Sequence, residues 1–128
     1  MIKAKKIICT VILAGALSAC SYMGDKHSVY FSPGSSELSM AQKTAIMKAA
    51  KQAKLEGKNV KISGYTDNTG SKELNKKISK KRVMKVSSEL EKLGIDKNKI
   101  SKHANGEGWW DKDGKPDRSK RRVEISVY

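Results

Sequence analysis

One arginine interrupts the apolar side of a predicted helix and draws attention to that helix as a binding element. The helix is predicted from Ser71, which can cap its start, to about Leu93, with Gly94 closing its end. At about 100° per residue, Arg82 lies on the same side as the apolar residues that follow it. A guanidinium inside an apolar stripe needs an acidic partner. A carboxylate is therefore expected close by.

The carboxylate best placed for that role is Asp67, which lies in the turn-prone loop that leads into the helix. Asn75 and Ser79 share the side of Arg82, so the first half of the stripe is polar and the second half apolar. Asp67 and Arg82 could pair with each other, or each could bind the opposite end of a zwitterion. The simpler alternative is that Asp67 satisfies backbone donors of its own turn and Arg82 reaches a local partner.

The first twenty residues are typical of a secretory signal. Residues 1–6 contain three lysines, residues 7–16 are apolar, and small residues lead into Cys20. The apolar run is shorter than the roughly 20 residues that a membrane-spanning helix needs. Residues 1–19 are therefore expected to be a signal peptide that is removed.

Leu17-Ser18-Ala19-Cys20 resembles the lipobox of bacterial lipoproteins. The resemblance implies a diacylglyceryl group on the sulfur of Cys20 and an acyl chain, such as palmitate, on the new amino terminus. Several acyl chains hold a domain at a membrane, whereas one binds only marginally. Ser21, where aspartate would imply retention at the inner membrane, favours the outer membrane.

Cysteine usage and charge narrow the function further. Cys9 would leave with the signal and Cys20 would carry lipid, which leaves no thiol for a disulfide or for thiolate chemistry. The formal net charge is +14, and losing the three lysines of residues 1–6 lowers it to +11. In a secreted chain this charge points away from nucleic acid and toward an acidic wall polymer or lipid headgroups. Lysines that only keep the surface soluble are the alternative.

The remaining pattern predicts one α+β domain with the order β-α-β-α-β-β, a small mixed sheet covered on one face by two helices. The expected elements are a tether at 20–28, strands at 29–31, 60–64, 100–104 and 122–127, helices at 39–55 and 71–93, and loops at 65–70 and 106–120. Ser39 can cap the first helix, whose core side is rich in alanine and can pack closely. The domain is expected to span residues 29–128.

Five groups of residues resemble, in order, the OmpA-like C-terminal domain. They are Val29-Tyr30-Phe31, Thr66-Asp67-Asn68-Thr69-Gly70, Asn75 with Ile78-Ser79 and Arg82, Gly106-Glu107, and Arg121-Arg122-Val123-Glu124-Ile125. The most specific part is the loop that contains Asp67, fifteen residues before Arg82. The peptidoglycan-associated lipoproteins combine this domain with an N-terminal lipid, as this chain is expected to do.

The resemblance implies a noncovalent site for the meso-diaminopimelate residue of the peptidoglycan stem peptide. The residues that the family pattern places there are Thr66, Asp67, Leu74, Asn75, Arg82 and Arg122. Asp67 would receive the ammonium group, Arg82 the carboxylate, and Asn75 would hydrogen-bond nearby. A ligand with both charges at one carbon needs one acceptor-only and one donor-only group. Diaminopimelate implies a Gram-negative envelope, with the domain in the periplasm.

The sequence departs from the family pattern at several positions. Tyr65 stands where histidine is common, Val83 where alanine is common, and Lys120 where asparagine usually precedes the paired arginines. Lys120 adds positive charge next to the expected pocket. Trp109 and Trp110 have no assigned counterpart.

Two other classes of function were weighed against wall binding. An enzyme is disfavoured because the mature chain has only His27 and His103, no cysteine nucleophile, and no cluster with metal-ligand spacing. No catalytic residue, cofactor or metal is therefore expected. The second alternative is a basic envelope lipoprotein that binds anionic lipid, or docks on an envelope machine through a lysine-rich helix. Such charge-driven binding would weaken steeply with salt.

Overall fold

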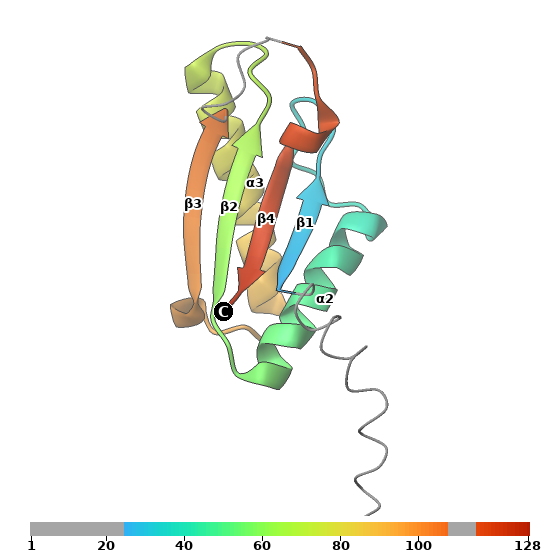
Figure 1. Cartoon of the computed structure of the whole chain (residues 1–128), viewed down its shortest axis with the longest axis vertical. Helices are drawn as coiled ribbons and strands as arrows, with labels where there is room; N and C mark the ends of the chain where they lie inside the picture. The colour runs from blue at the N-terminus through green and yellow to red at the C-terminus, as the bar shows by residue number, and fades with distance from the viewer. Residues whose placement is uncertain (1–24, 108–114) are drawn as a thin grey trace, which may run out of the picture.

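A computed structural model describes residues 25–107 and 115–128 as a four-stranded sheet with two long helices (Figure 1). The elements are β1 (Lys26–Tyr30), α2 (Met40–Glu56), β2 (Val60–Thr66), α3 (Lys72–Lys92), the 3-10 turn η1 (Lys97–Lys99), β3 (Ile100–Glu107), the 3-10 turn η2 (Arg118–Lys120) and β4 (Arg122–Val127). The predicted signal, Cys20, Trp109 and Trp110 lie outside the described residues.

The strands lie in the order β1-β4-β2-β3, and the sheet is mixed. β2 and β3 are parallel, whereas β4 is antiparallel to both of its neighbours, β1 and β2. Both helices cover the same face of the sheet (Figure 1). The predicted α+β class, element order and two-helix layer are therefore confirmed.

Helix α2 begins and ends as the sequence predicts. Ser39 precedes the helix in an extended conformation, and the backbone N–H of Ser39 donates to Oε1 of Gln42. Gly57 closes it with φ +62, the left-handed conformation that glycine adopts without penalty. The buried side is small, as expected, and consists of Ile46, Ala49, Ala50 and Ala53. This side lets α2 lie close to β1 and β4.

Helix α3 also matches the prediction, and one glycine decides how close it comes to the sheet. The Ser71 hydroxyl accepts the N–H of Leu74 at 3.1 Å and caps its start. A Cβ on Gly64 of β2 would come within 2.5 Å of Val83 Cγ2 and 3.0 Å of the Ser79 carbonyl oxygen. The backbone of α3 therefore touches β2 at a place where only glycine fits.

Three strands are longer than predicted. β1 begins at Lys26, so residues 26–28, which the sequence analysis places in the tether, pair with β4. β2 continues through Tyr65 and Thr66, and β3 continues through Gly106 and Glu107, all expected in loops. These polar ends pair through backbone groups and carry no hydrophobic signal. Among the described helices, none is long and apolar enough to cross a membrane.

Candidate functional site

A cavity of about 200 Å³ lies where β2 ends and α3 begins. It is lined by Pro33, Gly34, Thr66, Asp67, Thr69, Gly70, Leu74, Asn75, Ile78, Arg82 and Arg121. Five of the six residues that the sequence analysis assigns to a ligand site therefore meet around one cavity. The sixth, Arg122, does not line it.

Asp67 is 4% exposed and is held by hydrogen bonds on both carboxylate oxygens. Oδ1 accepts the Thr69 hydroxyl at 2.7 Å, and Oδ2 accepts the backbone N–H of Asp117 at 3.0 Å. Oδ2 also pairs with Nη1 of Arg121 at 2.8 Å. Burial alone would raise the pKa of Asp67, but these hydrogen bonds outweigh it and hold the pKa below its usual value. The carboxylate is therefore charged and fixed in place.

Arg82 is 1% exposed, and within the described residues it has no carboxylate partner. Instead it donates to three backbone carbonyls: Nε to Ser35 at 2.8 Å, Nη2 to Ser32 at 3.1 Å and Nη1 to Tyr65 at 3.4 Å. Its guanidinium also lies 5.0 Å from the centre of the Phe31 ring. Asp67 and Arg82 therefore do not form the direct pair that was one of the two alternatives, and backbone carbonyls accept from Arg82 instead.

The charge of Arg82 is disfavoured by its surroundings. Burial, and then repulsion from Arg121, lower the pKa of Arg82 to about 10, and attraction to Asp67 opposes this change only in part. At neutral pH the guanidinium remains protonated, since that value lies well above 7. An anionic group in the cavity would relieve both the burial penalty and the repulsion between the two arginines.

Arg121 is the site residue that the sequence analysis missed. Along β4, Val123, Ile125 and Val127 are buried beneath the helices, and Arg121 is two residues before Val123 on the same side. Arg122 points to the opposite face of the sheet. It pairs with Glu124 at 3.1 Å and lies 4.7 Å from the centre of the Tyr65 ring. The alternation of buried and exposed residues in β4, extended by one residue before Arg122, would have placed Arg121 on the buried side.

Asn75 and Thr66 line the cavity, and Ser79 lies next to it on α3. Asn75 Nδ2 donates to the Thr69 carbonyl at 2.9 Å and to Glu107 Oε2 at 3.2 Å. The Ser79 hydroxyl accepts the N–H of Gly106 at 3.0 Å and so ties α3 to β3. Thr66 Oγ1 is buried without a hydrogen-bond partner among the described residues. A buried hydroxyl of this kind is costly unless something pairs with it.

The groups that line the cavity can bind a charged ligand. Neither His27 nor His103 lines the cavity, and the described residues contain no cluster of three or more metal-ligating side chains. What the cavity offers is one fixed carboxylate, two guanidinium groups and one unpaired hydroxyl. These groups can hold a small ligand that carries both a positive and a negative charge.

Comparison with known proteins gives a consistent picture. The profile of the OmpA family matches residues 30–124. The OmpA-like domain of FopA1 from Francisella tularensis is 25% identical, with a TM-score of 0.66, 82% of this chain covered and 77% of that one. No curated protein sequence matches this chain.

Two further solved structures share the fold at lower identity. The peptidoglycan-associated lipoprotein of Burkholderia pseudomallei is 21% identical, with a TM-score of 0.68, 80% of this chain covered and 90% of that one. The C-terminal domain of Helicobacter pylori MotB is 20% identical, with a TM-score of 0.68, 79% of this chain covered and 83% of that one.

Proposed function

This chain belongs to the OmpA family, and on that premise we propose that it binds peptidoglycan noncovalently through the diaminopimelate of the stem peptide. Domains of this family are envelope domains that bind the cell wall. The observation that carries the finer proposal is the meeting of Asp67 and Arg82 at one cavity, together with Asn75 and Thr66.

The hydrogen bonds already made leave the right groups for such a ligand. A guanidinium has five N–H donors, and Arg82 uses three of them on carbonyls, which leaves one on each Nη for a carboxylate. Asp67 is kept ionised and offers negative charge to an ammonium group. The unpaired Thr66 hydroxyl and the exposed Leu74 at the rim complete the contact.

Arg121 has a supporting role in this proposal, and Arg122 has none. Arg121 Nη1 holds Asp67, and its Nε donates to the Phe31 carbonyl at 3.1 Å. It therefore fixes the carboxylate that receives the ammonium group. This arrangement replaces the assignment of Arg122 made from the family pattern.

The proposal includes a membrane anchor through lipid on Cys20. With the signal removed at that cysteine, the domain would stand in the periplasm of a Gram-negative cell and link the outer membrane to the wall. The name of the Burkholderia relative, a peptidoglycan-associated lipoprotein, supports the same combination of lipid and wall domain. No catalytic role, cofactor or metal is part of the proposal.

The test is co-sedimentation with purified sacculi. The mature chain, starting at residue 20 with Cys20→Ser, should sediment with sacculi that contain diaminopimelate, and free meso-diaminopimelate should release it. Sacculi that contain lysine in place of diaminopimelate are the matched control, because lysine lacks the second carboxylate. Equal binding to both kinds of sacculi, or no release by the free amino acid, would contradict the proposed ligand. Release of muropeptides would instead indicate an enzyme.

A further inference from the structure

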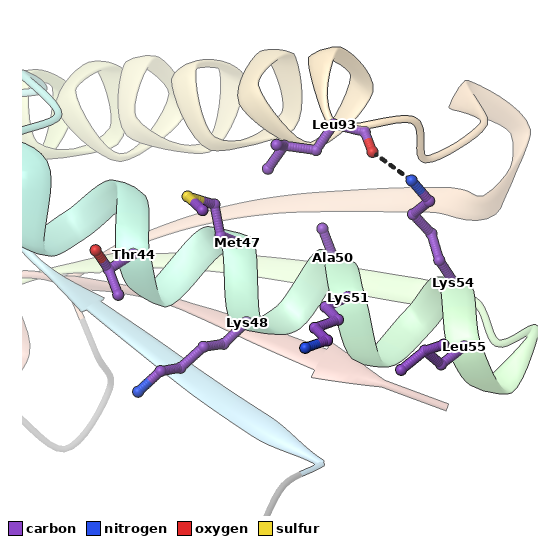
Figure 2. Close-up of a pocket in the computed structure, with 8 residues that line it drawn as sticks. All are labelled: Thr44, Met47, Lys48, Ala50, Lys51, Lys54, Leu55 and Leu93. Atoms are coloured by element: carbon purple, nitrogen blue, oxygen red, sulfur yellow. Dashed lines mark hydrogen bonds between the residues drawn. The ribbon is translucent and has the colours of Figure 1, made fainter.

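The outer side of α2 exposes three large apolar side chains. At about 100° per residue, Met40 and Leu55 point away from the buried alanine side, whereas Met47 lies near its edge, beside Ala50. The exposed fractions of Met40, Met47 and Leu55 are 79%, 52% and 77%. Single exposed apolar residues are common, but several on one side of a helix indicate a contact surface. Beside them an apolar hollow of about 490 Å³ runs toward Leu93 at the end of α3 (Figure 2).

Lysines lie among and beside these apolar side chains. Lys43, Lys48, Lys51 and Lys54 are exposed, and within the described residues none of them forms an ion pair. The only acidic residue of α2 is Glu56, at its last position. Lys48 and Lys51 are exposed, and Figure 2 shows Lys54 reaching toward α3, where it donates to the Leu93 carbonyl at 3.1 Å. The surface therefore attracts anionic partners.

The start of the described chain lies against the same helix. Gln52 donates to Asp25 Oδ1 at 3.2 Å and contacts the His27 ring nitrogen at 2.8 Å. Asp25 is the fifth residue after Cys20, a span of about 17 Å when extended. If Cys20 carries lipid, as the proposed function holds, α2 lies within reach of the bilayer.

We propose that the outer side of α2 is a membrane-contact surface that rests on anionic phospholipid headgroups. The four lysine amines would meet lipid phosphates, while Met40, Met47 and Leu55 enter the boundary between headgroups and acyl chains. The long lysine stems can lie along apolar surface with their charges at the phosphate level. This contact goes beyond wall binding, and it would orient the domain on its membrane.

Helix α3 offers a matched comparison. Lys77, Lys80, Lys81 and Lys85 also surround an exposed apolar side chain, Met84. Their hollow is bordered by Ser36 and Glu37, and none of these lysines contacts the start of β1. If net charge alone drove membrane binding, the lysines of both helices would contribute equally. If the lipid on Cys20 brings α2 to the membrane, the lysines of α2 should contribute more.

The experiment measures vesicle binding without lipidation. The hydrophobic core of the domain lies between Val29 and Val127, so we expect the mature chain with Cys20→Ser to fold without the signal. This protein is mixed with vesicles of phosphatidylglycerol and phosphatidylcholine. One variant replaces the four α2 lysines with glutamine, and the control replaces the four α3 lysines in the same way. Each lysine near an anionic surface contributes up to about fivefold. We expect at least about tenfold weaker binding for the α2 variant and less than about threefold for the α3 variant.

A second variant separates the apolar contact from the charge. Met40→Gln with Leu55→Gln keeps all four lysines and should weaken binding about fivefold, because apolar burial adds to the electrostatic attraction. Equal losses in the α2 and α3 variants, or no binding by the unmodified chain, would overturn the proposal. The proposal would also be overturned if sedimentation velocity showed a reversible dimer that Leu55→Gln abolishes, since a second copy of the chain would then cover this surface. Thermal melts check that every variant is folded, and the sacculus assay tests wall binding separately.

Discussion

Arg82 and Arg121 border the same cavity, but they are held by different groups. Arg82 is fixed by three backbone carbonyls, two of them in the loop between β1 and α2. Arg121 is fixed by Asp67 and by the carbonyl of Phe31. Arg82 therefore supports the loop that forms one wall of the cavity, as well as facing the ligand. Its replacement is expected to affect both stability and binding.

The first prediction concerns the two charges proposed to hold diaminopimelate. Asp67→Asn keeps the shape of the side chain and removes the charge that would receive the ammonium group, so sacculus binding should fall below detection. Arg82→Lys should also abolish binding, because an ammonium cannot present the separate donors of a guanidinium. Arg82→Ala should in addition lower the free energy of unfolding by about 3 kcal/mol, since it removes the three hydrogen bonds that Arg82 donates to backbone carbonyls.

These variants are measured by sacculus co-sedimentation, below the midpoint of each thermal melt. The double variant Asp67→Asn with Arg82→Lys should bind hardly worse than either single one, because both groups act on one ligand. Folded single variants that sediment as the unmodified chain does would show that the pair is purely structural.

The second prediction separates the neighbouring arginines. Arg121→Gln leaves the buried Asp67 carboxylate without its ion pair, which should lower stability by about 3 kcal/mol and weaken wall binding at least about tenfold. Arg122→Gln removes the same charge one residue away, and the contacts that it disturbs, with Glu124, the Ser119 carbonyl and the Tyr65 ring, lie outside the cavity lining. Its binding should change less than about twofold. Stronger loss from Arg122→Gln than from Arg121→Gln would restore the assignment made from sequence.

At the scale of single residues, the sequence selected residues that line one cavity but did not predict all of their hydrogen-bond partners. Asp67 and Arg82 stand out because charge in a turn and charge in an apolar stripe are unusual. That Arg82 would be satisfied by the carbonyls of Ser32 and Ser35 could not be predicted, because those carbonyls approach only after the loop closes over α3.

Among the elements, α2, α3 and β4 follow directly from caps, periodicity and alternation. Ser39, Ser71 and Gly57 occupy the expected capping positions. The added ends of β1, β2 and β3 were missed because their polar residues pair through the backbone, and hydrophobic pattern carries no information about such pairing.

The third prediction tests the contact between α3 and β2. Gly64→Ala should lower the free energy of unfolding by about 2 kcal/mol, because the new methyl group would overlap Val83 and press on the Ser79 carbonyl. In a Val83→Ala background the same change should cost less, since the nearest overlapping atom is gone. Chemical denaturation of the four proteins in this cycle measures the difference. If Gly64→Ala lowered the free energy of unfolding equally in both backgrounds, the Val83 side chain would be able to move aside without cost.

At the scale of the whole molecule, the cavity and the start of the described chain lie at opposite ends. In the sheet register, Lys26 pairs with Ser126 at one end, whereas Tyr30 and Tyr65 both pair with Arg122 at the other, next to the loop of Asp67. Figure 1 shows the beginning of β1 and the end of α2 together, away from the loop between β2 and α3. The attachment point of a lipid on Cys20 and the cavity would thus lie at opposite ends of the domain.

The fourth prediction concerns this proposed anchor. A fatty-acid analogue should label the full chain in cells and leave Cys20→Ala unlabelled, because the acyl chains need the thiol and the amino terminus of that residue. The labelled protein should fractionate with the outer membrane, since Ser21 is not aspartate. Ser21→Asp should shift it toward the inner membrane. Labelling that survives Cys20→Ala would show that the anchor lies elsewhere.

The pairing of β1 with β4 decides how the molecule would respond to mechanical load. A chain tied to a membrane before Lys26 and to a wall at the far end of the sheet is stretched along the axis of β1. The hydrogen bonds of an antiparallel ladder run perpendicular to that axis, and here the ladder extends from Lys26 with Ser126 to Tyr30 with Arg122. All of these bonds would then resist tension together, in shear, instead of opening one after another. A domain of this build can transmit force between two envelope layers without unravelling from its anchored end.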